Sequence, residues 1–117
     1  MTRKFLVAAA LMSVAVSFAT SNAAAPPKVV QIKGSAYNPS PVSVAQGDLV
    51  VWVNEDIAFT VVHTVTSCSV SGSSCAFDSD DILVAYALNT TSLARGRTYT
   101  YKCTIHPSMR GSLTINP

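Results

Sequence analysis

Residues 99–111, YTYKCTIHPSMRG, hold the most distinctive group of side chains in the sequence. A cysteine, a histidine and a methionine follow one another at three-residue intervals (Cys103, His106 and Met109). Apolar and polar residues alternate over 98–103 and again over 112–116, with the period of a β-strand. We therefore predict two strands joined by a tight loop that carries all three side chains.

Short segments with the same β-like pattern fill most of the remaining chain, between turns rich in Gly, Pro, Asn and Asp. The expected strands are Lys28–Lys33, Val42–Val44, Leu49–Val53 and Ile57–Thr66. Leu49–Val53 contains the only tryptophan, Trp52, and is apolar on both faces, which favours a central buried strand. Residues 67–81 are expected to form a loop, and Ile82–Leu88 fits a short helix or a strand. Strands at this spacing predict an all-β antiparallel sandwich or barrel.

The N-terminal residues 1–25 have the three parts of a secretory signal peptide. A basic head, Arg3-Lys4, precedes an apolar run over Phe5–Ala19 and a group of small residues at 21–25. The run is short for a membrane span, so we expect cleavage, with a retained membrane anchor as the alternative. The domain is then 26–117, and its location is periplasmic or extracellular.

The charge balance argues against a nucleic-acid partner. The full sequence has a net charge of +2, but removing the signal peptide leaves six basic and six acidic residues. No basic run with interleaved aromatic residues occurs. A mature chain of roughly ninety residues can bury one core with little surplus.

The chain has three cysteines, an odd number for an exported protein. Cys68 and Cys75 are close together and flanked by Ser and Gly, so we predict a short disulfide loop. Cys103 is then left as a free thiol, which persists more safely in an oxidising compartment if a metal binds it.

The donor types at 103, 106 and 109 suit copper, and a fourth ligand must come from elsewhere. His63 is the only other histidine, and it lies in a β-prone run in which Val61, His63 and Val65 would share one face. Two histidines, one thiolate and a weak axial thioether form a blue-copper electron-transfer site. Zinc is the chief rival, although a thioether is not a usual zinc ligand.

These residues resemble the copper-ligand loop of the cupredoxins, the small blue copper proteins. The spacing from Cys103 to Met109 is similar to that of amicyanin-like members, and plastocyanins have a longer gap. Upstream, VWVNED at 51–56 and HTVT at 63–66 resemble the segment that carries the first ligand. The resemblance extends over residues 35–48 and covers essentially the whole predicted mature chain.

The resemblance implies a Greek-key β-sandwich with one type 1 copper ion. His63, Cys103 and His106 would be equatorial ligands and Met109 the axial one. Asn54 would lie behind the ligands and link the two ligand-bearing loops, and His106 would be the partly exposed ligand through which electrons pass. The chain departs from the family pattern at residues 57–61, which replace a tight turn with a longer segment, and at the insert from Cys68 to Cys75.

The function expected from this pattern is that of an exported one-electron carrier between larger redox proteins, not an enzyme. We expect a monomer that docks transiently through an apolar patch at His106, Pro107 and Ser108, with no nucleic-acid partner and no membrane attachment after cleavage. The alternative is a copper-binding or delivery protein with labile copper, although the mature chain has no Met besides Met109 to favour it. A structural zinc-binding β domain is the third possibility.

Overall fold

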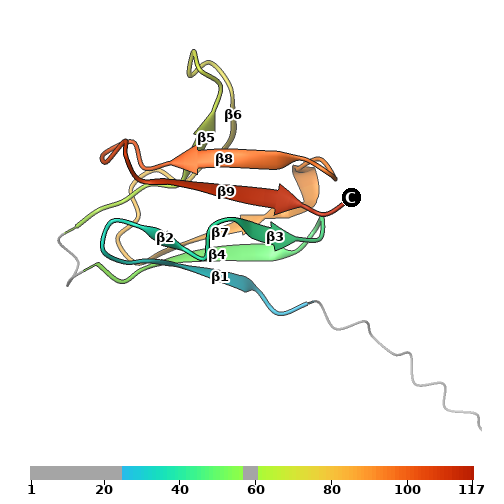
Figure 1. Ribbon diagram of the computed structural model, residues 1–117, viewed down its shortest axis with the longest axis horizontal. Helices are drawn as coiled ribbons and strands as arrows, with labels where there is room; N and C mark the ends of the chain where they lie inside the picture. Colours follow the sequence, from blue (N-terminus) through green and yellow to red (C-terminus); the bar gives the residue numbers. More distant parts are fainter. Residues whose placement is uncertain (1–24, 57–60) are drawn as a thin grey trace, which may run out of the picture.

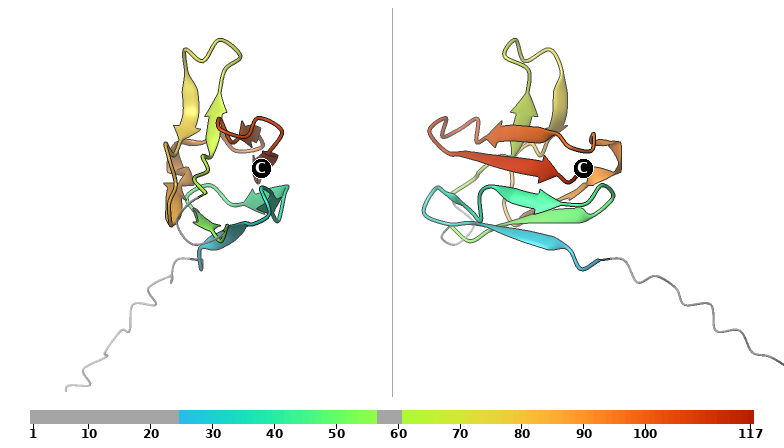
Figure 2. Two further views of the ribbon diagram at one scale, coloured as in Figure 1. Left: turned by 90° about the vertical axis from the view of Figure 1, so that its left-hand side faces the viewer. Right: turned by 45° about the vertical axis from the view of Figure 1, so that its right-hand side comes forward.

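The computed structural model describes residues 25–56 and 61–117, which form two β-sheets packed face to face (Figures 1 and 2). The first sheet has the strand order β2-β1-β4-β7. Its strands are β1 (Lys28–Ile32), β2 (Tyr37–Asn38), β4 (Leu49–Asn54) and β7 (Ala85–Asn89). The predicted all-β sandwich is therefore confirmed.

The second sheet carries the predicted cysteine strand at its centre. Its order is β3-β9-β8-β5-β6. Its strands are β3 (Val42–Val44), β5 (Thr66–Cys68), β6 (Cys75–Asp78), β8 (Thr98–Lys102) and β9 (Arg110–Ile115). A single 3₁₀ turn, η1 (Thr90–Ser92), follows β7. β8 and β9 pair antiparallel from Thr98 opposite Thr114 to Lys102 opposite Arg110, so the loop between them starts and ends at neighbouring points.

The core between the sheets is aromatic and β-branched. β4 lies between β1 and β7, and its Trp52 is fully buried, as predicted for a central strand. The Trp52 ring lies 5.5 Å from the Tyr101 ring, edge to face, and 5.8 Å from Tyr86. Tyr101 and Cys103 both point inward, as the alternation predicted. This packing holds the end of β8 against the opposite sheet.

Two strand pairs are parallel, which differs from the expected antiparallel sheets. β1 pairs parallel with β4, and β3 pairs parallel with β9. A parallel pair requires a connection that returns the chain to its starting end. For the β1–β4 pair, residues 33–48 provide that connection. They add β2 beside β1 and cross to the other sheet as β3, before the chain returns to the first sheet as β4.

The loop expected over 67–81 is wrong, and the strand expected over Ile57–Thr66 is wrong for its described residues 61–65. Residues 57–60 lie outside the described part, and over 61–65 the only β pairing is one bridge between His63 and Ile82. Strand β5 begins only at Thr66 and forms a hairpin with β6 that projects from the body (Figure 1). Within it the predicted Cys68–Cys75 disulfide is confirmed. The ambiguous segment 82–88 contains a strand, β7, and not a helix.

The predicted signal peptide falls almost entirely outside the described residues. Among the residues that are described, no helix has the length and apolar character needed to span a bilayer.

Candidate metal centre

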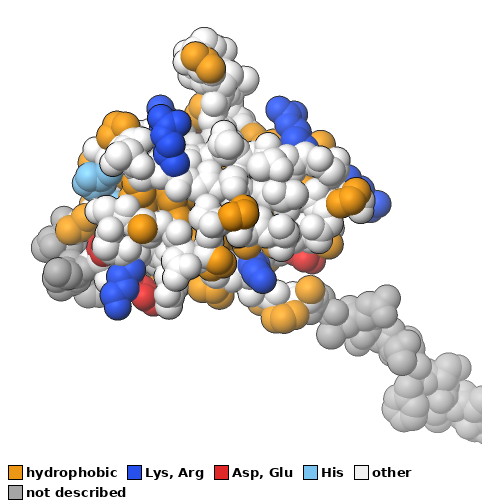
Figure 3. Space-filling view, viewed as in Figure 1, with side chains coloured by type: hydrophobic (Ala, Val, Ile, Leu, Met, Phe, Trp, Pro, Cys, Tyr) orange, Lys and Arg blue, Asp and Glu red, His pale blue; other side chains and the backbone are white. Residues whose placement is uncertain are grey.

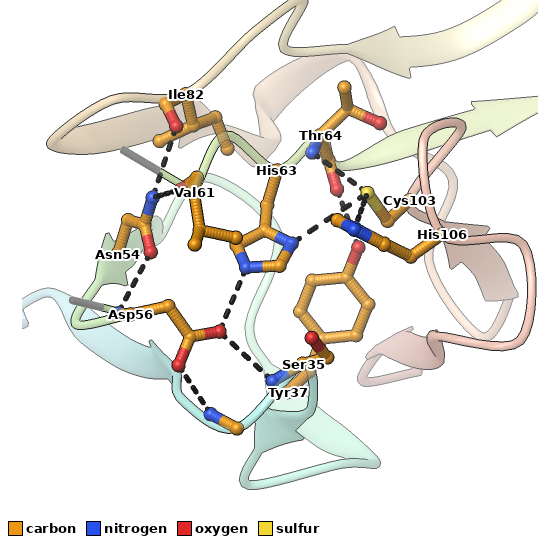
Figure 4. Close-up of polar contacts among 11 residues, drawn as sticks. Ser35, Tyr37, Asn54, Asp56, Val61, His63, Thr64, Ile82, Cys103 and His106 are labelled. Atoms are coloured by element: carbon orange, nitrogen blue, oxygen red, sulfur yellow. Dashed lines mark hydrogen bonds and ion pairs between the residues drawn. The ribbon is translucent and has the colours of Figure 1, made fainter. Parts of the chain in front are cut away.

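Three of the four predicted ligands come together at one end of the sandwich (Figure 4). The thiol of Cys103 lies 3.6 Å from Nδ1 of His106 and 3.9 Å from Nδ1 of His63. The three donor atoms all lie within 4.8 Å of one another. Cys103 directly follows β8, whereas His63 lies in the irregular segment before β5. The site therefore joins two segments that lie forty residues apart in the sequence.

The loop between β8 and β9 is closed by its own backbone. The N–H of Met109 donates to the carbonyl of His106 at 2.8 Å, and the N–H of Cys103 donates to the carbonyl of Met109 at 3.1 Å. Met109 and Cys103 are buried, and His106 is partly exposed. The three-residue spacing therefore forms a compact turn, with Cys103 and Met109 buried at its base and His106 nearer the surface.

The spacing of the donor atoms fits a metal ion. A metal with bonds of about 2.0–2.3 Å to nitrogen and sulfur, at the centre of a trigonal set, places its ligands about 3.5–4 Å apart. The measured separations of 3.6 and 3.9 Å agree with that arrangement. Both histidines present Nδ1 to the thiol, which leaves Nε2 free for other partners. A soft thiolate with two imidazoles and a nearby buried thioether is a donor set for copper.

Thr64 connects the two ligand-bearing segments. Its N–H donates to the Cys103 sulfur at 3.3 Å, and its hydroxyl accepts from the N–H of Thr104 at 2.9 Å. Its carbonyl accepts from the buried hydroxyl of Tyr37. Thr64 was not predicted as a site residue, because its only signal in the sequence is its position next to His63.

Asn54 organises the segment that leads to His63. Its amide donates to the carbonyl of Val61 at 2.8 Å and to that of Ile82 at 3.2 Å, and its side-chain oxygen accepts from the N–H of Asp56 at 3.1 Å. These bonds lie on the His63 side of the site. The cross-link to the Cys103 loop, which the resemblance assigned to Asn54, is made in this structure by Thr64.

Asp56 is the second site residue that the sequence analysis missed. Its Oδ2 lies 2.8 Å from Nε2 of the fully buried His63. Its two oxygens also accept from the N–H groups of Gly34, at 2.5 Å, and Ser35, at 2.9 Å. Burial acts to raise the pKa of Asp56, but the hydrogen bonds from Ser35, Gly34 and His63 outweigh it and lower the pKa, so the group is a carboxylate at neutral pH.

Two tyrosines under the site stay neutral over an extended pH range. Burial raises the pKa of Tyr37, and the neighbouring Cys103 and Tyr101 add to the effect. Burial also raises the pKa of Tyr101. The two rings pack edge to face with centroids 4.8 Å apart. The two rings thus form an uncharged aromatic layer beside Cys103.

The exposed side of the site is small and partly apolar. His63 is fully buried and the sequence has only two histidines, so the histidine at the surface in Figure 3 is His106. Pro107 and Ser108 are exposed beside it, and Ile105 is 48% exposed. We call Ile105–Ser108 the rim of the site.

The fold is similar to solved structures of amicyanin. A methionine-to-alanine mutant of amicyanin in its Cu(I) form is 31% identical, with a TM-score of 0.64, over 81% of this chain and 87% of that one. A proline-to-glycine mutant of amicyanin, in the reduced Cu(I) form at pH 4, is 30% identical with the same coverage and TM-score.

A copper-containing nitrite reductase from Thermus scotoductus SA-01 shares the fold, with a TM-score of 0.68 and 24% identity, but the match covers 25% of that chain and 87% of this one. No protein-family model matches the sequence, and no curated protein sequence does either.

Proposed function

This chain belongs to the cupredoxin family and has one type 1 copper site, and from that premise we propose that it is an exported one-electron carrier between larger redox proteins. The observation that supports the proposal most directly is the convergence of the Cys103 thiol with Nδ1 of His63 and Nδ1 of His106, at 3.9 and 3.6 Å.

We propose His63, Cys103 and His106 as equatorial ligands, with Met109 as a weak axial one. Copper bound there supplies a centre that alternates between the +1 and +2 states. The protein's contribution is to hold the ligands in place. The β8–β9 loop is closed by its own hydrogen bonds, and Thr64 ties it to the His63 segment. A site that moves little between the two states has a low reorganisation cost, which favours rapid electron transfer.

The first experiment is to add Cu(II) to the purified apoprotein and record its visible and electron paramagnetic resonance spectra. An intense blue band with narrow copper hyperfine splitting is expected for a thiolate ligand. A pale tetragonal signal would exclude Cys103 as an equatorial ligand and favour a delivery protein or a zinc site. The variant Met109→Ala should shift the reduction potential or the spectrum, and it should have little effect on a structural zinc site.

The rim of the site is the proposed docking surface for the redox partners. It surrounds the one ligand that reaches the surface, and a small apolar patch suits a weak, transient interface. Replacing Pro107 or Ser108 by Glu should slow electron exchange while copper binding stays normal. Val70→Glu is the matched control, because Val70 is a fully exposed apolar residue on the projecting β5–β6 hairpin. An equal effect of all three variants would contradict a docking role for the rim.

Export to the periplasm or the extracellular space, and a monomeric state, remain part of the same proposal. N-terminal sequencing of the exported protein should find a chain that begins near Pro26. Sedimentation of that chain should give the mass of a single copy.

A further inference from the structure

The two histidines of the site are supported in different ways. Nε2 of His63 lies 2.8 Å from the Asp56 carboxylate and the His63 side chain has no exposed surface, whereas His106 is partly exposed on a loop. A carboxylate at Nε2 can only accept a hydrogen bond, so His63 must carry its proton there. The lone pair is then left on Nδ1, which faces the Cys103 thiol.

The position of Asp56 is itself strongly determined. Gly34 and Ser35 both have left-handed backbone, with φ of +61° and +52°, and their consecutive N–H groups both donate to the carboxylate. Such a conformation is uncommon for a residue other than glycine, and paired N–H groups of this kind form a site for an anion. On its other side, the backbone N–H of Asp56 donates a hydrogen bond to the side-chain oxygen of Asn54. Asp56 is thus fixed by the β1–β2 turn and by the end of β4.

We propose that Asp56 is a positioning residue that selects the His63 tautomer able to bind copper and sets the reduction potential of the site. The inference deepens the proposed function and relies on it for the potential. A negative carboxylate hydrogen-bonded to a ligand histidine makes that imidazole a stronger donor. The effect favours Cu(II), the more highly charged state, and lowers the potential.

The test compares Asp56→Asn and Asp56→Ala with Glu55→Gln. Glu55 is the adjacent carboxylate, but it bonds at the surface to Gln31, at 3.4 Å, and not to a ligand. Glu55→Gln therefore removes the same charge from the same region and leaves His63 unchanged. Outer partners of ligand histidines change metal affinity by about 10- to 100-fold when removed.

Asp56→Asn should lower Cu(II) affinity at least about tenfold more than Cu(I) affinity, and each factor of ten raises the potential by about 59 mV for a one-electron couple. Glu55→Gln should leave the potential at the wild-type value. An unchanged potential in Asp56→Asn, or equal shifts in both variants, would overturn the assignment of the potential to Asp56.

The tautomer is read without copper, from the ¹⁵N resonances of the His63 ring in the apoprotein. We expect the form protonated at Nε2 alone in the wild type and in Glu55→Gln, and a mixture in Asp56→Ala. A single unchanged tautomer in Asp56→Ala would overturn the positioning role. If the wild type failed to form a blue site, the proposed function would fall, and this comparison would still decide what Asp56 does to His63.

Discussion

Gly111 leaves no room for a side chain, and the substitution Gly111→Ala probes how tightly the strand under the ligand loop is packed. Gly111 lies in β9 directly opposite Tyr101 of β8. A Cβ atom at Gly111 would lie 2.5 Å from Cζ and from the hydroxyl oxygen of Tyr101, and 2.6 Å from Cε2. Separations this short lie far inside van der Waals contact, so either the ring or the strand must move.

The ring has little freedom to move. Tyr101 is 2% exposed and packs against Tyr37 and Trp52, with ring centroids 4.8 and 5.5 Å away. Forcing extra volume into a packed core costs about 1–3 kcal/mol. In a domain of roughly ninety residues each kcal/mol lowers Tm by about 4–8 °C. Urea denaturation of the apoprotein, followed by circular dichroism, should therefore show a clear loss of stability in Gly111→Ala.

A second substitution identifies the cause. The Tyr101 hydroxyl is buried and has no hydrogen-bond partner among the described residues, so Tyr101→Phe alone should cost little. In the double variant the missing hydroxyl removes one of the close contacts, so Gly111→Ala should cost less than in the wild type. A Gly111→Ala protein within about 0.5 kcal/mol of the wild type, the ordinary range for surface changes, would refute the argument.

Three further predictions concern the link between the ligand segments, the hairpin and the buried tyrosines. Thr64→Val removes the acceptor for the Thr104 N–H, so it should cost about 1 kcal/mol of unfolding free energy and speed copper release, measured by transfer to a chelator. Cys68→Ser opens a bridge between residues seven apart, so it should cost about 2 kcal/mol in urea denaturation with the copper spectrum unchanged. Tyr37 and Tyr101 have raised pKa values when folded, so the free energy of unfolding should be constant up to about pH 9 and fall above the unfolded pKa of 10.0.

Each of these has a clear contrary result. An unaltered copper release rate in Thr64→Val would mean that the backbone N–H to the Cys103 sulfur holds the two segments together alone. A changed blue band in Cys68→Ser would show that the hairpin does influence the site. Stability that rose between pH 10 and 11 would contradict the direction of the tyrosine pKa shifts, because the unfolded chain should lose those protons first.

The ligands could be predicted from sequence because they are mostly local. Cys103, His106 and Met109 lie within seven residues, and their spacing is visible without any knowledge of the fold. His63 was predicted because it is the one remaining histidine, although residues 61–65, the described residues before β5, do not form the regular strand that was expected to carry it. The structure places it instead on a single β-bridge to Ile82.

Features that depend on contacts across the fold were not predictable. β6 has one buried residue, Phe77, among its four, so residues 67–81 show no apolar alternation and their sequence predicts a loop. Backbone pairing and the disulfide form that hairpin. The direction of a strand pair is also absent from the pattern of side chains, so the parallel β1–β4 and β3–β9 pairs gave no signal.

The contact between Asp56 and His63 joins the two ends of the segment in which the sequence departs from the family pattern. Residues 57–61 lengthen the turn expected from the family pattern, and Asp56 with its carboxylate and the buried His63 lie on either side of them. Asp56 is held by β4 and by the turn after β1, not by the loop that contains three of the four ligands. The rim can therefore be shaped to suit a redox partner while the first histidine, and the charge behind it, stay anchored in the sandwich.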